Sequence, residues 1–242
     1  MTATTATSGG MGERSNGAIV QVSDFLEAGP INRVALDLAA AIQRFGGDSK
    51  IISGGGLMVA EAERAHVEHE TVSISSANPI GNPSGKIAAK LSDWRTQLVH
   101  SHGEDAAGHV LKAVGKHHVP HVVSLYDLPV QRSGKPTPGL RNALKGDRVL
   151  LASQFLQNLL AEAGYLDGVV SSVIPPGLAV NALHPSVVTA ARLTRMVRDM
   201  EITAQSPVIL FPAALQEGAG HDVVIEALKE HTDRTWVCLF IG

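Results

Sequence analysis

The 242-residue sequence predicts an α/β fold built on a doubly wound parallel sheet, followed by an incomplete second α/β unit. Two observations support this prediction. Short runs of apolar, β-branched residues are typical of strands that are buried on both faces. These runs alternate with segments whose apolar residues recur at helical spacing, which is the pattern of strands joined by crossover helices.

The pattern is clearest between Gly17 and Gly56, where strand 18–23 is followed by a glycine turn, a helix to about residue 45 and strand 50–53. The helix presents one apolar stripe to the sheet: Ile31, Val34, Ala35, Leu38, Ile42 and Phe45. Gly29 ends the turn at the carboxyl edge of the first strand, where backbone N–H groups and the helix dipole favour anions. Ligands of α/β proteins bind at this edge.

The following elements repeat this alternation. We expect strands at 71–74, 98–102, 121–126, 148–152 and 171–174. A helix capped by Ser84 runs through Trp94, and a later one presents Ala106, Val110, Leu111 and Val114. Residues 78–84 and 129–146 have the composition of loops, and the second of these carries Arg132, Lys135, Arg141 and Lys145. The helix after residue 153 has an apolar face of Phe155, Leu156, Leu159 and Leu160.

A second α/β unit begins after a linker and a helix at 190–200, with strand 208–211, helix 222–231 and strand 236–241. We therefore expect a disordered tail (1–16), a first α/β domain (17–180), a linker and helix (181–205) and the truncated start of a second domain (206–242). Two strands and one helix are too few to enclose a core. The strand at 236–241 would keep an unpaired edge, which predicts aggregation or a homodimer.

Composition excludes several classes of protein. Hydrophobic residues make up 44% of the chain, and its formal charge of −3 gives no reason to expect a nucleic-acid partner. The single cysteine, Cys238, lies in an apolar run and is predicted to be a buried thiol. No run is long enough to span a bilayer, and residues 1–16 have no secretory h-region, so we expect a cytoplasmic protein.

The order of six motifs resembles glycosyltransferase family four, whose members have two Rossmann-like domains in the GT-B arrangement. The motifs span 27–33 (Glu-Ala-Gly-Pro-Ile-Asn-Arg), 99–102 (Val-His-Ser-His), 126–127 (Tyr-Asp), 147–156 (Asp-Arg-Val-Leu-Leu-Ala-Ser-Gln-Phe-Leu), 174–177 (Ile-Pro-Pro-Gly) and 211–222. The resemblance implies an acceptor-side domain followed by the opening of a donor domain. It also implies a hexosyltransferase that moves a sugar from a nucleotide-sugar to a glycolipid or surface-polysaccharide acceptor, with no metal.

The sequence departs from the family at several positions of the site. Ala214 and Ala219 stand where the resemblance implies an Arg and a Lys that hold the departing diphosphate. Tyr126 replaces a His, Pro30 replaces a Gly, and the Glu pair of the donor site would fall beyond Gly242. These departures make activity of this chain doubtful and favour an alternative, a non-catalytic relative that acts as a binding or assembly module.

The candidate site residues are those that follow the strands at the carboxyl edge. We assign Asp127 and Tyr126 to catalysis, and place Gly29, Arg33, His102, Ser153 and Gly177 in the acceptor or donor cleft. Asp127 would orient an acceptor hydroxyl or act as its base. Each has an alternative: Gly29 in a tight turn, Arg33 on a solvated face, Asp127 capping a turn and Ser153 capping a helix.

The histidines are assigned separately. We expect His100 to be a core residue and His102 to line the cleft, with His117, His118 and His121 at a helix end and in a loop. No third ligand accompanies His100 and His102, so no metal site is predicted.

The resemblance also indicates the ligands and partners of the protein. The nucleotide-sugar would serve as co-substrate, and no cofactor is expected. A nicotinamide oxidoreductase ranks last, because the first turn lacks the dinucleotide fingerprint and the second strand ends in Ser53-Gly54. The basic loop between Arg132 and Arg148 is either a solvated loop or a contact to anionic lipid at the inner membrane face.

Overall fold

The computed structural model describes residues 17–74, 81–115, 119–127, 136–178, 180, 184–203, 206–230 and 236–242. Contacts divide the chain into two compact units, Met1–Leu178 and Ala179–Gly242. The predicted tail, the loop at 78–80 and the basic residues Arg132 and Lys135 lie outside the described residues, as do His117 and His118.

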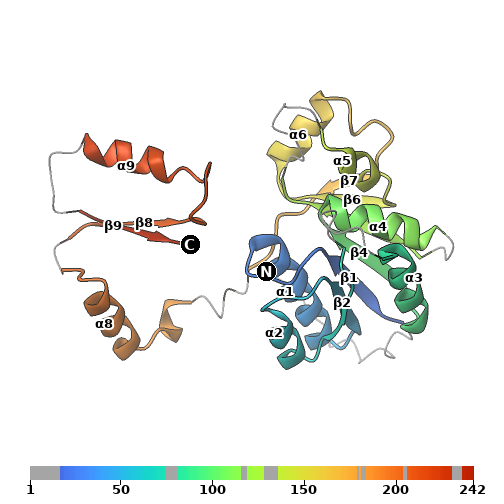
Figure 1. Ribbon diagram of the computed structural model, residues 1–242, viewed down its shortest axis with the longest axis horizontal. Helices are drawn as coiled ribbons and strands as arrows, with labels where there is room; N and C mark the ends of the chain where they lie inside the picture. The colour runs from blue at the N-terminus through green and yellow to red at the C-terminus, as the bar shows by residue number, and fades with distance from the viewer. Residues whose placement is uncertain are drawn as a thin grey trace, which may run out of the picture. The chain divides into compact units, whose positions relative to one another are not determined.

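The first unit contains a seven-stranded, fully parallel sheet, which confirms the predicted fold class (Figure 1). The strand order is β3-β2-β1-β4-β5-β6-β7. The strands are β1 (Ile19–Ser23), β2 (Ser49–Ser53), β3 (Glu68–Thr71), β4 (Leu98–His102), β5 (His121–Leu125), β6 (Arg148–Leu151) and β7 (Ser171–Val173). Sequence order reverses between β1 and β4, as in other doubly wound sheets.

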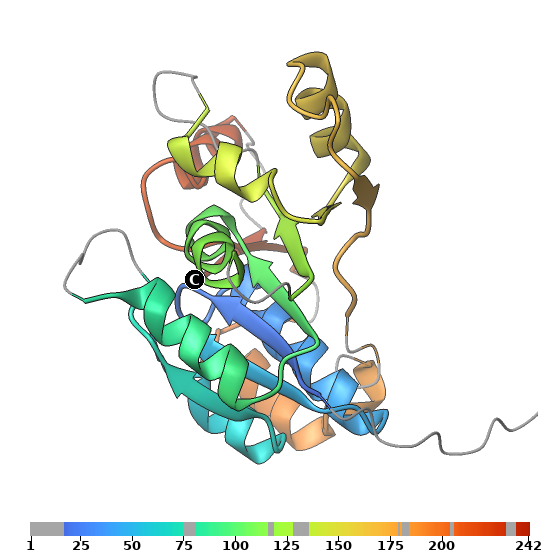
Figure 2. The same cartoon turned by 90° about the vertical axis from the view of Figure 1, so that its right-hand side faces the viewer.

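Helices cover both faces of this sheet. They are α1 (Pro30–Arg44), α2 (Val59–Arg64), α3 (Pro83–Asp93), α4 (Glu104–Val114), α5 (Pro138–Ala143) and α6 (Gln154–Glu162). Ile51 belongs to the same core cluster as Leu36 of α1, whereas its neighbour Ile52 belongs to the cluster that includes Val110 of α4. Because successive strand residues face opposite sides, α1 and α4 lie on opposite faces. Figures 1 and 2 show the strands between the two helix layers.

The apolar stripe of α1 differs from its prediction. The buried residues are Ala35, Leu36 and Ala39, whereas the predicted Phe45 is 91% exposed. Phe45 is the C-cap residue, so its side chain lies beyond the last turn that packs on the sheet. Similarly, Phe155 of α6 was predicted to face the core but is 73% exposed.

Two short helices were missed, and one strand was displaced. Helices α2 and α5 have six residues each, and no side chain caps the N-terminus of either. Helix α5 occupies part of the segment predicted as a loop. Strand β3 ends at Thr71, where the predicted strand begins. Asn82, not Ser84, caps α3 by accepting a hydrogen bond from the Gly85 N–H at 3.0 Å.

The second unit comprises a 3-10 helix (Pro185–Val187), α8 (Ala190–Asp199), β8 (Val208–Pro212), α9 (His221–Lys229) and β9 (Val237–Ile241). Strands β8 and β9 form a two-stranded parallel sheet. None of the described residues between 180 and 242 is buried. Cys238 was predicted to be a buried thiol but is only half-buried, because this small sheet is covered incompletely. No helix in the described part of the chain is long and apolar enough to cross a membrane.

Candidate functional site

The carboxyl ends of the strands in the first unit open into a cavity of about 340 Å³. Its walls come from the start of α1, the ends of β5 and β6, and the segment after β7. The lining residues are Pro30, Ile31, Arg33, Val34, Asp37, Tyr126, Asp127, Ala152, Pro176, Gly177 and Leu178. The cavity therefore lies at the sheet edge that the glycine turn and the strand order predict as the ligand site.

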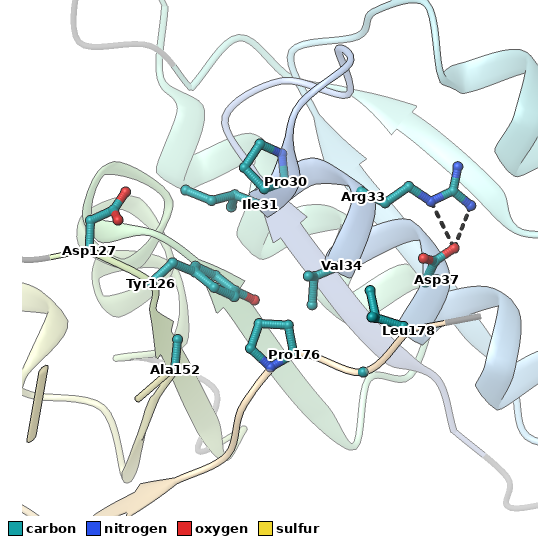
Figure 3. Close-up of a pocket in the computed structure, with 11 residues that line it drawn as sticks. Pro30, Ile31, Arg33, Val34, Asp37, Tyr126, Asp127, Ala152, Pro176 and Leu178 are labelled. Carbon is teal, nitrogen blue, oxygen red and sulfur yellow. Dashed lines mark hydrogen bonds and ion pairs between the residues drawn. The ribbon is translucent and has the colours of Figure 1, made fainter. Parts of the chain in front are cut away.

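Polar and apolar groups are separated within this cavity (Figure 3). Asp127 lies at one end and the paired side chains of Arg33 and Asp37 at the other. The side chains between them are largely apolar: Ile31, Val34, Tyr126, Pro176 and Leu178. The middle of the cavity thus presents carbon atoms, with one phenol hydroxyl among them.

Tyr126 is held by a buried polar chain under the cavity. Nδ1 of His102 lies 2.7 Å from the Tyr126 hydroxyl, and Nε2 lies 2.9 Å from Oε1 of Gln21. With the Gln21 amide oriented this way, Nε2 of His102 donates to Oε1, so the Tyr126 hydroxyl donates to Nδ1. The rings of His102 and Tyr126 are stacked at an interplanar angle of 11°. These hydrogen bonds from Gln21 through His102 to Tyr126 fix the position of the phenol.

Strand register explains how the sequence brings these residues together. Ser23, His102 and Ser124 occupy the same level of neighbouring strands β1, β4 and β5. Gln21 and Tyr126 lie two residues away from this level on β1 and after β5, and therefore face the same side. The result is a row of buried polar side chains on the sheet face that α1 covers.

Burial keeps the side chains of His102 and Tyr126 uncharged. Desolvation lowers the pKa of His102 well below its usual value, and the neighbouring His100 lowers it further. Desolvation raises the pKa of Tyr126 to about 12, against the opposing effect of the Ser124 hydroxyl. Near neutral pH, Tyr126 is therefore a hydrogen-bond donor and not a base.

Arg33 is neutralised by carboxylates. Nε of its guanidinium donates to Oδ1 of Asp37 at 2.9 Å, and Nη1 pairs with Oε1 of Glu61 at 2.8 Å. The hydrogen bond to Asp37 is the main reason that the pKa of Arg33 is raised above its usual value. The Arg33 side chain therefore lies at the cavity, as predicted, but its charge is already shared between two acids.

The structure brings four of the seven predicted site residues together around the cavity, namely Arg33, Tyr126, Asp127 and Gly177. His102 differs from the expectation of a cleft-lining side chain. It is only 1% exposed and lies behind Tyr126, because its ring points into the face covered by α1. Gly29 is the N-cap of α1, directly before the lining residue Pro30. Ser153 caps α6 by accepting from the Leu156 N–H at 3.1 Å.

The remaining histidines belong to the core. His100 is buried, as predicted, with Nε2 2.7 Å from the Ser124 hydroxyl. His121 was grouped with the helix-end and loop histidines, although the predicted strand 121–126 begins with it. It is buried in β5, 2.8 Å from the Ser101 hydroxyl. No group of three His, Cys, Asp or Glu residues in the described ranges is arranged to hold a metal ion.

Asp24 is a polar residue of this edge that sequence reasoning missed. It follows β1 and meets the N-terminus of α4, where the Ala106 N–H donates to it. Desolvation raises its pKa to about 6, and the nearby Asp105 adds to the effect. No motif marks this residue, because its environment depends on the packing of α4 against β1.

The apolar wall was also missed. Ile31 and Val34 were assigned to the stripe that packs on the sheet, yet both are half-buried and line the cavity. Of the six residues in the predicted stripe of α1, Ala35 is buried, whereas Ile31 and Val34 lie at the cavity. Helical spacing does not reveal that the apolar side of α1 extends past the strands that α1 covers.

The fold of the chain is that of GT-B glycosyltransferases. A glycosyltransferase structure from Rickettsia africae has a TM-score of 0.75 at 23% identity, over 94% of this chain and 61% of that one. HepE from Anabaena, solved with UDP-glucose, has a TM-score of 0.76 at 15% identity, over 93% and 60%. MurG from Acinetobacter baumannii has a TM-score of 0.51 at 11% identity, over 89% and 58%. At these identities the likeness shows the fold alone.

The family follows from the sequence itself. The family model "Glycosyltransferase Family 4" matches residues 31–181, more than half of the chain. The chain therefore belongs to glycosyltransferase family 4, which confirms the predicted resemblance. No curated protein matches it. The chain spans about three fifths of the length of the Rickettsia and Anabaena proteins.

Proposed function

We propose that this chain provides the acceptor side of a glycosyltransferase that moves a sugar from a nucleotide-sugar to a glycolipid or surface-polysaccharide acceptor. The observation that carries the proposal is the cavity at the carboxyl edge of the sheet, with Tyr126 and Asp127 on its wall, in a chain of family 4. The nucleotide-sugar is a co-substrate, and no cofactor or metal is required. The protein would act in the cytoplasm, at the inner membrane face.

The two polar residues would have different roles in the transfer. The acceptor hydroxyl oxygen forms a bond to the anomeric carbon of the sugar, and the bond from that carbon to the diphosphate oxygen breaks. The hydroxyl proton passes to the Asp127 carboxylate, and the nucleoside diphosphate leaves with the electron pair of the broken bond. Tyr126, kept neutral by burial and held in place by its hydrogen bond to His102, would position the acceptor.

HepE supports a nucleotide-sugar as donor, since its structures are described as complexes with UDP-glucose, with UDP and glucose, and with UDP. Their likeness to this chain covers residues of both units, because it extends over 92–93% of its length. We infer that the loop between β8 and α9 belongs to the donor side, as the family resemblance implies.

Calorimetric titration of the chain with UDP, GDP, ADP and their sugars tests the proposal. We expect saturable binding of one nucleotide and its sugar, and transfer or slow hydrolysis of that sugar. Asp127→Asn should lower turnover about 10²-fold or more while leaving nucleotide affinity unchanged, as removal of a general base does. Asp167→Asn, an exposed residue outside the cavity, is the matched control. Equal turnover of both variants would remove Asp127 from the mechanism.

Ala214 and Ala219 favour a second candidate, a non-catalytic relative that keeps the fold as a binding or assembly module. The segment 213–220 carries no cationic side chain. A leaving diphosphate needs fixed positive charge close to its oxygens, since it departs as an anion. No binding of any nucleotide by the folded chain would favour this candidate over transfer.

A gain-of-function variant separates the two candidates further. If the two alanines occupy donor-site positions, Ala214→Arg with Ala219→Lys should raise nucleotide affinity at least about tenfold, as charge-assisted hydrogen bonds to phosphate do. Leu215→Arg with Gln216→Lys adds the same charge to neighbouring exposed positions and serves as control. Equal gains in both variants would indicate a general charge effect and no donor site.

A further inference from the structure

The residues that line the cavity indicate which class of acceptor it binds, which family membership alone does not. We infer that the cavity binds the apolar, uncharged part of a neutral acceptor, such as an aryl or alkyl aglycone, and disfavours anionic acceptors. This inference rests on the proposed function, because it names the class of acceptor for the same site. The sequence leaves two acceptor classes open, a glycolipid and a polysaccharide, and this inference favours an acceptor with an apolar group over a polysaccharide.

The lining of the cavity favours an apolar ligand. The side chains in the middle of the cavity offer almost no hydrogen-bond partners: Ile31, Val34, Ala152, Pro176 and Leu178. A polysaccharide presents hydroxyl groups on every side, and hydroxyls that lose water here would go unpaired, which is unfavourable. An apolar group loses no hydrogen bonds on entering, and it gains from leaving water.

The cavity is large enough for an aryl or alkyl group. A cavity of about 150 Å³ lined by aliphatic and aromatic side chains can hold benzene. The present cavity has about 340 Å³, which is within the usual range for small-molecule sites. It therefore has room for one aromatic ring or a short alkyl chain, with space left for the sugar hydroxyl that reaches Asp127.

The charges around the cavity disfavour an anionic acceptor. The guanidinium of Arg33 is held by the carboxylates of Asp37 and Glu61, and Asp127 lies at the opposite end of the cavity. The hydrogen bonds to two acids leave Arg33 little capacity to pair with a phosphate, and the surrounding acids would repel one. Among the described lining residues, Arg33 is the only cation. A phosphate-bearing acceptor would therefore find no free positive charge on this wall.

Three related ligands test these arguments with the full chain. Methyl β-glucoside, phenyl β-glucoside and phenyl β-glucuronide differ first by an apolar ring and then by a carboxylate. We expect phenyl β-glucoside to bind at least about tenfold more tightly than methyl β-glucoside, which requires burial of about 55 Å² of apolar surface at about 25 cal/mol per Å². Phenyl β-glucuronide should bind more weakly than the phenyl glucoside, because its carboxylate meets the acids of the cavity.

Calorimetry gives the affinities, and saturation-transfer NMR should show the strongest saturation at the phenyl protons.

Two pairs of variants locate the site. Ala152→Leu fills the cavity, whereas Ala161→Leu makes the same change at an exposed position outside it. Leu178→Asp places a carboxylate on the wall at a residue that is 75% exposed, so folding should be unaffected; Leu57→Asp, at 83% exposure outside the cavity, is its control. Only the first member of each pair should weaken phenyl glucoside binding about tenfold.

Several results would overturn the inference. These are equal affinity for the methyl and phenyl glucosides, binding of the glucuronide as tight as that of the phenyl glucoside, or equal effects within each pair of variants. Binding of a nucleotide-sugar without preference for the phenyl ligand would overturn this inference and leave the proposed function standing. If the chain binds the phenyl glucoside but binds no nucleotide or nucleotide-sugar, the acceptor class is supported and the proposed transfer is contradicted.

Discussion

The two units of the chain are built from the same strand–helix–strand pattern but differ in what that pattern encloses. In the first unit, seven strands lie between helices on both faces, and core residues such as Leu151 are 0% exposed. In the second unit, the corresponding apolar residue Leu210 of β8 is 55% exposed, and no described residue is buried. The local sequence pattern is equivalent, whereas the number of strands that share a core is not.

This difference determines which unit can hold functional side chains in fixed positions. Tyr126 is fixed because two further strands supply Gln21 and His102 behind it. In the second unit, β8 has one neighbouring strand, and the loop after it carries Ala214 and Ala219 without such support. A catalytic constellation needs supporting contacts around the residues that act. The first unit provides them at the acceptor side, and the described part of the second unit provides fewer.

The largest expected effect comes from separating the two units. A fragment of residues 1–178 should unfold in urea in one cooperative transition, because its sheet and core are complete within it. A fragment of residues 179–242 should lack a cooperative transition, since its apolar residues remain largely in water. Circular dichroism during urea titration measures both. A cooperative transition of the second fragment as a monomer would contradict the comparison.

A matched pair of leucine substitutions tests the same contrast inside the full chain. Leu151→Ala should lower the free energy of unfolding by about 2–5 kcal/mol, because it opens a cavity in a closed core. Leu210→Ala should cost less than about 1 kcal/mol, because that side chain is already half in water. Trp94 fluorescence in a Trp236→Phe background follows the first unit, and Trp236 fluorescence in a Trp94→Phe background follows the second. Similar costs would show that the second unit has a core of its own.

Acid should destabilise the first unit through its buried histidines. Burial lowers the pKa of His100 and of His121 to about 4, and that of His102 well below its usual 6.5. Between about pH 6.5 and 4 the unfolded chain therefore binds protons that the folded unit does not, and stability falls as the pH is lowered. Asp24 opposes this, since its pKa is raised to about 6 and its folded form gains a proton in the same range.

Three histidines against one acid leave a net loss of stability, on the order of 2–3 kcal/mol per pH unit in the middle of this range. Urea midpoints between pH 4.5 and 6.5 measure the slope. His100→Gln should reduce it by about half, because one of about two net protons is removed and an amide can keep the contact with Ser124 without titrating. His184→Gln in the second unit is exposed and should leave the slope unchanged. A slope that is unaffected by His100→Gln would exclude this origin of the acid sensitivity.

The sequence predicts most of the fold because strands such as β8 and β9 are continuous apolar runs, a local property. It does not predict α2 and α5, because both are short and begin without a capping side chain. Tyr126 and Asp127 could be found from their place at the end of a strand, and Arg33 and Gly177 from the family motifs that contain them. The contact of His102 with Tyr126, in contrast, depends on how β4 and β5 align, a relation between residues 24 positions apart.

The smallest expected effect is weak self-association through the second unit. Both strands of its sheet have an edge that is unpaired within the described residues, and β8 exposes Val208 and Leu210. Edge strands with apolar side chains pair with further chains unless charge prevents it. Sedimentation velocity should show a concentration-dependent dimer that Val208→Lys with Leu210→Lys abolishes, while Phe45→Lys, the same change at an exposed site of the first unit, leaves the dimer intact. A monomer at high concentration would show that the exposed strands are protected by other means, and the contrast between the two units would then be one of stability alone.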